Sequence, residues 1–427
     1  MDGSADEGLD GLARTYVQLG LRLGRVVPGL VDAHLGDAAA AERADDGPSP
    51  APEDLRREAV ALRRRLVEHP GPRADYLDAQ LAACEVVAGR AAGERFAFVD
   101  EVRGCLGVDV APGPEDRYRA AHDALAALLG VPLRRLPAAM TAFRDADRVP
   151  PEALRDATAA VLAGLREATA ATVGLPSGEA VDLEVVAGAP WAGFTRRVGP
   201  RRSVMQVAVD AGHRWTHLPL LAAHEAYPGH HTEAARTEGT VRPERTLLLA
   251  RTPQSLVAEG AAELGLEAVV GTGWGRWAAD RLVGIAGAPR PERAALGEAV
   301  EAASEPLTSV RQDAALLLHG SSAVDREERA RAHLRRWLLV DDDRADRMLE
   351  FLGHPRWRIH TTTYVEGARL VRRWLAARPA GTPAGSRFAR LLDESWTPEM
   401  LHRDLRPTGD GERYPRHVRD TPMSPSV

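Results

Sequence analysis

The most informative stretch of the sequence is the segment His224-Glu225-Ala226-Tyr227-Pro228-Gly229-His230-His231. Without Pro228 and Gly229 it reads His-Glu-Ala-Tyr-His, the pattern in which one helix face presents two zinc-binding imidazoles beside a glutamate that acts as general base. On a straight helix, His224 and His231 would lie about 10 Å apart along the axis. Zinc needs each imidazole nitrogen at about 2.0–2.1 Å. Pro228 and Gly229 both break helices, so the sequence predicts a bend between the histidines.

The doublet at the end of this segment leaves two choices for the second histidine ligand. If Pro228-Gly229 is an insertion, His230 takes the place of the second ligand and His231 faces about 100° away around the helix. We favour His230 and keep His231 as the alternative ligand, or as a neighbour of the site. Ordinary surface or core histidines are a poorer explanation, because three histidines and a glutamate follow the apolar run 218–223 within one short segment.

A third ligand is expected in the apolar segment 256–267, where Glu259, Glu263 and Glu267 recur every four residues. Side chains at this spacing share one helix face. Carboxylates on a helix of Ala, Leu and Val are costly to bury unless they are paired or bind a metal. We therefore expect Glu259 as the acidic ligand. Glu263, one turn later, is expected to hydrogen-bond a ligand histidine or to replace Glu259. The alternative is an exposed acidic stripe on a surface helix.

The composition limits the classes of partner. A net charge of −6 and a pI near 6.2 give no electrostatic case for nucleic acid or an anionic membrane. Lysine is absent, so all 55 basic residues are arginines, which excludes a Schiff-base lysine and a P-loop lysine. Cys84 and Cys105 lack ligand spacing and are expected in the core. The acidic segment 1–7 does not look like a signal peptide and no apolar run could span a bilayer, so we expect a cytoplasmic protein.

Helical periodicity dominates the rest of the chain. It predicts a mainly α, multi-helical fold with a small β-sheet before the metal-binding helix. The histidine motif adds the expectation of a zincin-like metallopeptidase architecture. The sheet could accept an extended substrate at its edge or be a structural hairpin. We expect an N-terminal helical region (1–172) packed with a metal-site region (173–405) as one globular unit, and then a tail (406–427). Beyond the segments above, helices are expected near 115–130, 151–172, 291–318, 323–339 and 362–378, and strands at 181–186 and 203–209.

With both acidic and histidine segments identified, the chain resembles a bacterial family catalogued as domain of unknown function 885. The resemblance rests on 223–231, on Glu259-Gly260, and more weakly on Tyr364-Val365-Glu366-Gly367, and it covers about 181–375. Members of the family look like helical gluzincin-type metallopeptidases. The resemblance implies His224 and the His230/His231 pair as histidine ligands, Glu225 as base and Glu259 as acidic ligand. Ala261 and Leu264 stand where the family usually has aromatic residues.

We expect a metal-dependent hydrolase with one zinc ion per chain that cleaves a small peptide or a related amide. Manganese or cobalt would also suit two histidines and a glutamate. Glu225 would act as base. Tyr364 is expected to donate a hydrogen bond to the oxyanion, or else to be a core tyrosine. His360 and Arg358 are candidate substrate contacts, because an arginine there could bind a carboxylate bidentately, as in a carboxypeptidase.

Two other classes of protein remain open from the sequence. One is a metal-binding or catalytically degenerate zincin-like scaffold without turnover, which the loss of the two aromatics favours and the retention of Glu225 opposes. The other is a di-iron helical bundle, which needs paired Glu-x-x-His motifs. Only Glu399-Met400-Leu401-His402 has that form, so the second alternative is weak. The sequence does not indicate an oligomeric state.

Overall fold

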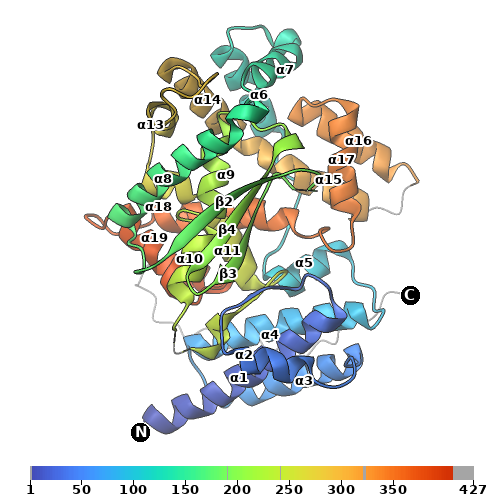
Figure 1. The fold of residues 1–427 in the computed structure, drawn as a ribbon. Coiled ribbons are helices and arrows are strands. Elements are labelled where there is room, and N and C mark those ends of the chain that lie inside the picture. Colours follow the sequence, from blue (N-terminus) through green and yellow to red (C-terminus); the bar gives the residue numbers. More distant parts are fainter. Residues whose placement is uncertain (1, 190, 241, 321–323, 407–427) are drawn as a thin grey trace.

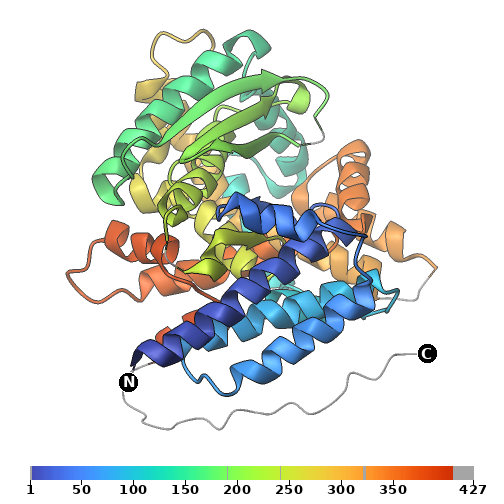
Figure 2. The ribbon, with the colours of Figure 1, turned by 60° about the horizontal axis from the view of Figure 1, so that its bottom comes forward.

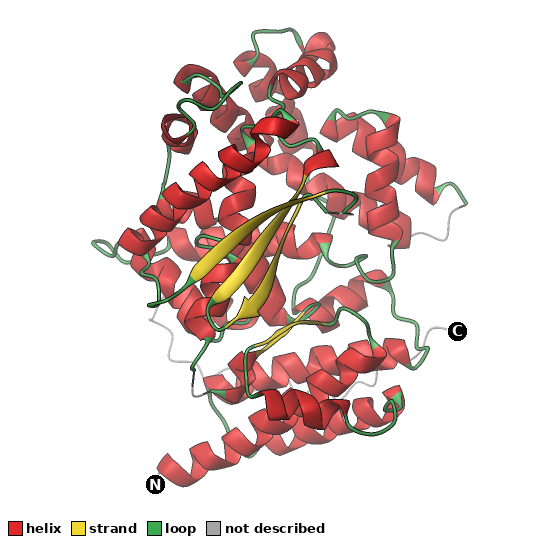
Figure 3. Ribbon diagram, viewed as in Figure 1, coloured by secondary structure: helices red, strands yellow, loops and turns green. Residues whose placement is uncertain are grey.

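The computed structural model describes residues 2–189, 191–240, 242–320 and 324–406. Helix accounts for 65% of the structure and strand for 8%, which confirms the predicted mainly α fold class with small sheets. Figure 3 shows a small sheet surrounded by helices. Each described helix is too short or too polar to cross a lipid bilayer. Apart from Arg406, the predicted C-terminal tail lies outside the described residues.

The first part of the chain is almost entirely helical. In α3 apolar residues at three- and four-residue spacing are buried on one face: Leu55, Ala59, Leu62 and Leu66. Pro52 begins the helix, where its missing N–H costs nothing. Helices α1 to α5 form the lower layer in Figure 1, and Figure 2 brings this layer to the front. The helices are α1 (Asp2–Val26), α2 (Ala38–Asp45), α3 (Pro52–Leu66), α4 (Pro72–Ala91), α5 (Phe98–Leu106), α6 (Glu115–Leu128), α7 (Leu136–Ala146) and α8 (Leu154–Thr172), with 3-10 turns η1 (Leu133–Arg135) and η2 (Pro151–Ala153).

Two small sheets follow. The larger has the order β2-β4-β3, in which β2 (Ala180–Val186) runs parallel to β4 (Arg202–Ala208) and β3 (Gly193–Gly199) runs antiparallel to it. The strands β2 and β4 match the two predicted strands, whereas β3 was not predicted. The larger sheet packs against helices α8, α9 and α10. The second sheet pairs β1 (Val31–His34) with β5 (Leu247–Leu249) in antiparallel register.

The elements that carry the predicted metal site follow the sheet in the sequence. The expected helix over 291–318 is interrupted by a 3-10 turn, and the one over 362–378 begins with a π-helical turn, η6. The elements are η3 (Val209–Ala211), α9 (His217–Glu225), α10 (His230–Thr237), η4 (Pro243–Thr246), α11 (Pro253–Glu263), α12 (Gly265–Val269), α13 (Trp274–Arg281), α14 (Pro291–Ser304), η5 (Glu305–Thr308), α15 (Ser309–Gly320), α16 (Arg326–Leu338), α17 (Asp342–Gly353), η6 (Thr363–Gly367), α18 (Ala368–Ala376), α19 (Ala384–Asp393) and α20 (Pro398–Asp404).

The core consists of two clusters of buried apolar side chains. The first lies mainly among α1, α3 to α6 and α14 to α17, and it contains Cys84 and Cys105, as expected. The second lies mainly among α8, β4, α9 and α18 to α20. Helix α11 belongs to both, because Leu256 packs in the first cluster and Val257 in the second. This helix, which carries Glu259, therefore joins the two halves of the core.

Candidate metal centre

The break predicted inside the histidine-rich segment is present. Helix α9 ends at Glu225 and α10 begins at His230, and the Tyr227–Pro228 peptide bond between them is cis. The N–H of Gly229 donates to the carbonyl of Ala223 at 2.9 Å. A Cβ at Gly229 would lie 1.8 Å from the carbonyl oxygen of His224, so only glycine lets the chain fold back this closely.

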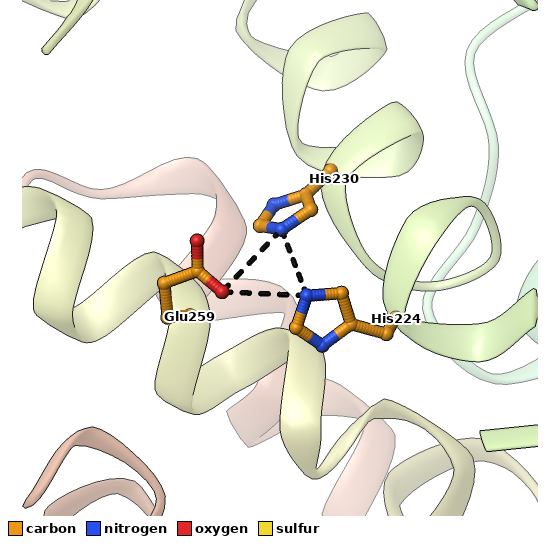
Figure 4. Close-up of side chains that lie close together, drawn as sticks. All are labelled: His224, His230 and Glu259. Carbon is orange, nitrogen blue, oxygen red and sulfur yellow. Dashed lines mark hydrogen bonds and ion pairs between the residues drawn. The ribbon is translucent and has the colours of Figure 1, made fainter. Parts of the chain in front are cut away.

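This turn brings two imidazoles and a carboxylate to one point (Figure 4). The Nε2 atoms of His224 and His230 lie 3.1 Å apart, and Oε2 of Glu259 lies 3.3 Å from the first and 3.7 Å from the second. One ligand atom from each residue fits within a span of 4.8 Å. Oε2 of Glu259 is buried and accepts no hydrogen bond from the described part of the chain. Two imidazoles and one carboxylate are a donor set that catalytic zinc uses, so these residues fit a divalent ion.

The charges of the three groups depend on one another. Burial alone would raise the pKa of Glu259, but His230 and His224 lower it well below the usual value. Burial alone would lower the pKa of His224, but Glu259 and Glu263 raise it well above its usual value. The positive charge of the protonated imidazoles thus balances the negative charge of the carboxylates. A metal ion bound here must displace those protons, because only the neutral imidazole is a ligand.

Two further glutamates frame the centre. Oε1 of Glu263 lies 3.2 Å from Nδ1 of His224, the ring nitrogen opposite the one that faces the cluster. A carboxylate in that position orients the ring and fixes its tautomer. Glu225 makes no hydrogen bond or ion pair with the described residues, although its charge acts on His230 and Tyr364. Its carboxylate is therefore available to accept a proton from a bound water or substrate.

His231 points away from the cluster into a buried network. Its Nε2 lies 3.1 Å from Oε2 of Glu179, and its Nδ1 lies 2.8 Å from the Ser203 hydroxyl on β4. The Tyr227 hydroxyl donates to the same Glu179 oxygen at 2.6 Å, and Arg166 pairs with the other oxygen at 2.7 Å. Tyr227 and His231 flank the turn that carries His230. The buried carboxylate of Glu179 therefore fixes both ends of this turn. The sequence pattern gave no sign of this role.

The segment with Tyr364 reaches the site through a glycine–glycine crossing. A Cβ on Gly260 would lie 2.3 Å from the carbonyl carbon of Gly367, and a Cβ on Gly367 would lie 2.3 Å from the carbonyl oxygen of Leu256. Helix α11 and the π-helical turn η6 therefore touch backbone to backbone. The crossing places Glu259 beside the segment that carries Tyr364, which gives a physical reason for the Glu-Gly and Tyr-x-x-Gly patterns.

Tyr364 and His360 lie next to the three ligand groups. The Tyr364 hydroxyl lies 2.9 Å from Nε2 of His360, which in turn lies 3.9 Å from Oε1 of Glu259. The rings of Tyr364 and His224 are 6.1 Å apart. Burial and Glu259 raise the pKa of Tyr364 well above its usual value, so the phenol keeps its proton and remains a hydrogen-bond donor.

Arg358 lies differently from the substrate contact expected from sequence. Its Nη2 lies 2.5 Å from Oε2 of Glu101, a side chain that is 1% exposed and also pairs with Arg90 at 2.6 Å. The guanidinium is thus engaged with a carboxylate of the protein itself.

Comparisons with known proteins give the fold some context. No family model matches the chain, and no curated protein matches it either. Its structure is similar to that of a candidate lipoprotein from Colwellia psychrerythraea, with 14% sequence identity and a TM-score of 0.50. The match covers 87% of this chain and 70% of that chain. At this identity the likeness concerns the fold alone, so any function has to be argued from the site.

Proposed function

We propose that the chain is a metal-dependent hydrolase, with one zinc ion per chain, that cleaves a peptide or a related amide bond. The observation that supports it is the meeting of His224, His230 and Glu259, together with Glu225, whose charge acts on His230 and whose carboxylate pairs with no described residue. A zinc ion held by the three ligands would polarise the scissile carbonyl and lower the pKa of a bound water to about 7. A purely structural site would have no use for Glu225.

The protein groups around the ligands supply the remaining chemistry. Glu225 accepts a proton from the attacking water and delivers it to the leaving amine, the role for which its free carboxylate suits it. The Tyr364 hydroxyl, protonated and oriented by His360 at 2.9 Å, donates a hydrogen bond to the developing oxyanion. Glu263 keeps the His224 ring in the orientation that aims Nε2 at the cluster. Each group thus has one role that its surroundings explain.

The substrate we propose is a small peptide or amide. The strand β3 forms an edge of its sheet and packs against α9, the helix of His224. An extended chain can add to such an edge through main-chain hydrogen bonds. We also propose that the chain is related to the family of domain of unknown function 885, which its motifs resemble, and that it is cytoplasmic.

The competing function is a metal-binding scaffold without turnover. Ala261 and Leu264, which replace the aromatics of the resembled family, are 4% and 3% exposed and pack in the second core cluster. Compared with aromatic residues, these smaller side chains therefore change the packing of the core. They do not alter the three ligand groups. Metal analysis of the purified protein, followed by hydrolysis assays on blocked and unblocked peptides, tests the proposal. Bound metal without hydrolysis of any peptide or amide would favour the scaffold.

A further inference from the structure

Next to the candidate metal centre lies a group of arginines with too few carboxylates. We call Arg251, Arg356 and Arg358 the arginine cluster. Glu101 is close to Arg251 and Arg358, and the charges of Arg251 and Arg356 act on each other. Within the cluster, Arg358 pairs with Glu101, whereas Arg251 and Arg356 form no ion pair with any described residue. The Nε atoms of all three are buried and have no hydrogen-bond partner among the residues that the structure describes. A buried cation is expensive unless an anion or hydrogen-bond acceptor meets it.

Arg251 is the most unusual member of the arginine cluster. It is 8% exposed, and its backbone has a φ of +59°, a left-handed conformation that non-glycine side chains rarely adopt. The neighbouring N–H of Ala250 donates to the carbonyl of Leu30 at 2.8 Å, which fixes the chain just before it. Such a backbone persists only where the surroundings impose it, and it is found preferentially where ligands bind.

The position of Arg251 links the cluster to the metal centre. Arg251 lies between β5 and α11, and α11 carries Glu259. The positive charge of Arg251 acts on His360, whose ring lies 3.9 Å from Glu259. Arg356 lies against Gly29, where a Cβ would come 1.9 Å from its guanidinium carbon, and stacks over Trp357 at 4.2 Å. The missing side chain of Gly29 leaves room for this guanidinium.

Asp32, on β1, does not supply the missing negative charge. The positive charges of Arg251 and Arg356 act on its carboxyl group, but no ion pair joins it to either within the described part of the chain. Its side chain is exposed to solvent, which screens its negative charge from the two arginines.

We infer that Arg251, together with Arg356, binds a carboxylate of the substrate, so that the enzyme acts on peptides or amides that carry a free carboxylate. The inference rests on the proposed hydrolase function and narrows it. A guanidinium presents a planar set of N–H donors that matches a carboxylate with two parallel hydrogen bonds. The carboxylate is that of a C-terminus or of an acidic side chain, two sources with one chemistry.

The test measures binding and needs neither metal nor turnover. Calorimetric titration of the purified full chain with N-acetyl-leucine, its amide, and N-acetyl-glutamic acid α-amide gives three dissociation constants. We expect at least one of the two acids to bind about tenfold more tightly than the neutral amide, a difference of about 1.4 kcal/mol. Preference for the first acid indicates a C-terminal carboxylate, and preference for the second indicates a side-chain carboxylate. Equal binding of all three, or no binding, would overturn the inference.

Variants of single arginines test whether Arg251 causes the preference for the acids. Arg251→Gln should abolish it, and the less buried Arg356→Gln should weaken it several-fold, which keeps the test decisive if the first variant folds poorly by circular dichroism. Arg90→Gln is the matched control, because it also removes an arginine that neighbours Glu101, and it should leave the preference intact. An undiminished preference in folded Arg251→Gln, or an equal loss in Arg90→Gln, would contradict the assignment. Carboxylate preference without bound metal or hydrolysis would instead refute the hydrolase proposal alone.

Discussion

At the scale of single residues, the site gives two neighbouring histidines different surroundings. His230 faces His224 and Glu259, whereas His231 is held by Glu179 and Ser203. Removing a ligand leaves two protein donors, too few for a tightly held catalytic zinc. His230→Ala should therefore lose most of its metal, as measured by plasma mass spectrometry. His231→Ala should keep metal when folded but unfold at a lower denaturant concentration. Equal metal loss in both folded variants would contradict this division.

The free carboxylate of Glu225 leads to a second prediction at this scale. Glu225→Gln preserves the size of the side chain and touches none of the three ligand groups. Because an amide cannot accept the proton of the attacking water, hydrolysis should fall by about 10²- to 10⁴-fold. Metal content and unfolding temperature should stay unchanged. Wild-type rates in this variant would remove Glu225 from the mechanism.

At the scale of elements, the crossing of α11 and η6 determines where Glu259 and Tyr364 meet. Gly367→Ala would place a methyl group 2.3 Å from the Leu256 carbonyl oxygen, so the two backbones must move apart. We expect a loss of about 1–3 kcal/mol in the free energy of unfolding and, in the folded fraction, slower hydrolysis because Tyr364 shifts. Denaturant titration and kinetics measure both effects.

The matched control for that crossing is Gly11→Ala in α1, where an added Cβ meets nothing within 4 Å. Alanine is a better helix former than glycine, so this variant should be as stable as the wild type or up to about 1 kcal/mol more stable. Its activity should be unchanged. If Gly367→Ala behaved like Gly11→Ala, the close crossing would have no energetic meaning.

Between the sheet and α10, Glu179 gives stability a defined pH dependence. Burial raises its pKa, but hydrogen bonds from Tyr227, His231 and Arg166 outweigh this and lower the pKa below its ordinary 4.5. A carboxyl whose pKa is lower in the folded state stabilises the fold above its unfolded pKa and loses that contribution as the pH falls. Glu179→Gln should therefore cost about 1–3 kcal/mol at pH 7. The difference from wild type should shrink below about pH 4.5. A difference independent of pH in urea unfolding would show that charge is unimportant there.

The elements also show what the sequence could predict and what it could not. The break at Pro228-Gly229 was predictable because both residues act locally on the backbone. The β3 strand was missed because Gly193–Gly199 contains two glycines and two arginines and lacks a clear alternation of apolar residues. Glu179 precedes His231 by 52 positions, and Arg251 is notable for its left-handed backbone and for a buried Nε without a partner among the described residues. Both features arise from tertiary packing and leave no local pattern.

At the scale of the whole molecule, the candidate ligands come from helices that pack in different parts of the core. Helix α9 belongs to the second cluster, while α11, with Glu259, joins that cluster to the first. Without metal, the attraction between protonated imidazoles and charged carboxylates holds these helices together at the site. An ion bound by His224, His230 and Glu259 would cross-link them, so its effect should reach the unfolding of the entire chain.

Metal should accordingly raise the thermal stability of the folded protein. An ion that binds only the folded state adds about 2.7 kcal/mol when its free concentration is 100 times the dissociation constant. Chelation should lower the midpoint of unfolding measured by calorimetry, and added zinc should restore it. Glu259→Gln should remove most of this response, whereas Glu225→Gln should retain it, because Glu225 is adjacent to a ligand without being one. Because the imidazoles must lose protons to bind metal, the response should also weaken as the pH falls. A midpoint insensitive to chelator in metal-loaded protein would mean that the ion does not bind at this junction of the core.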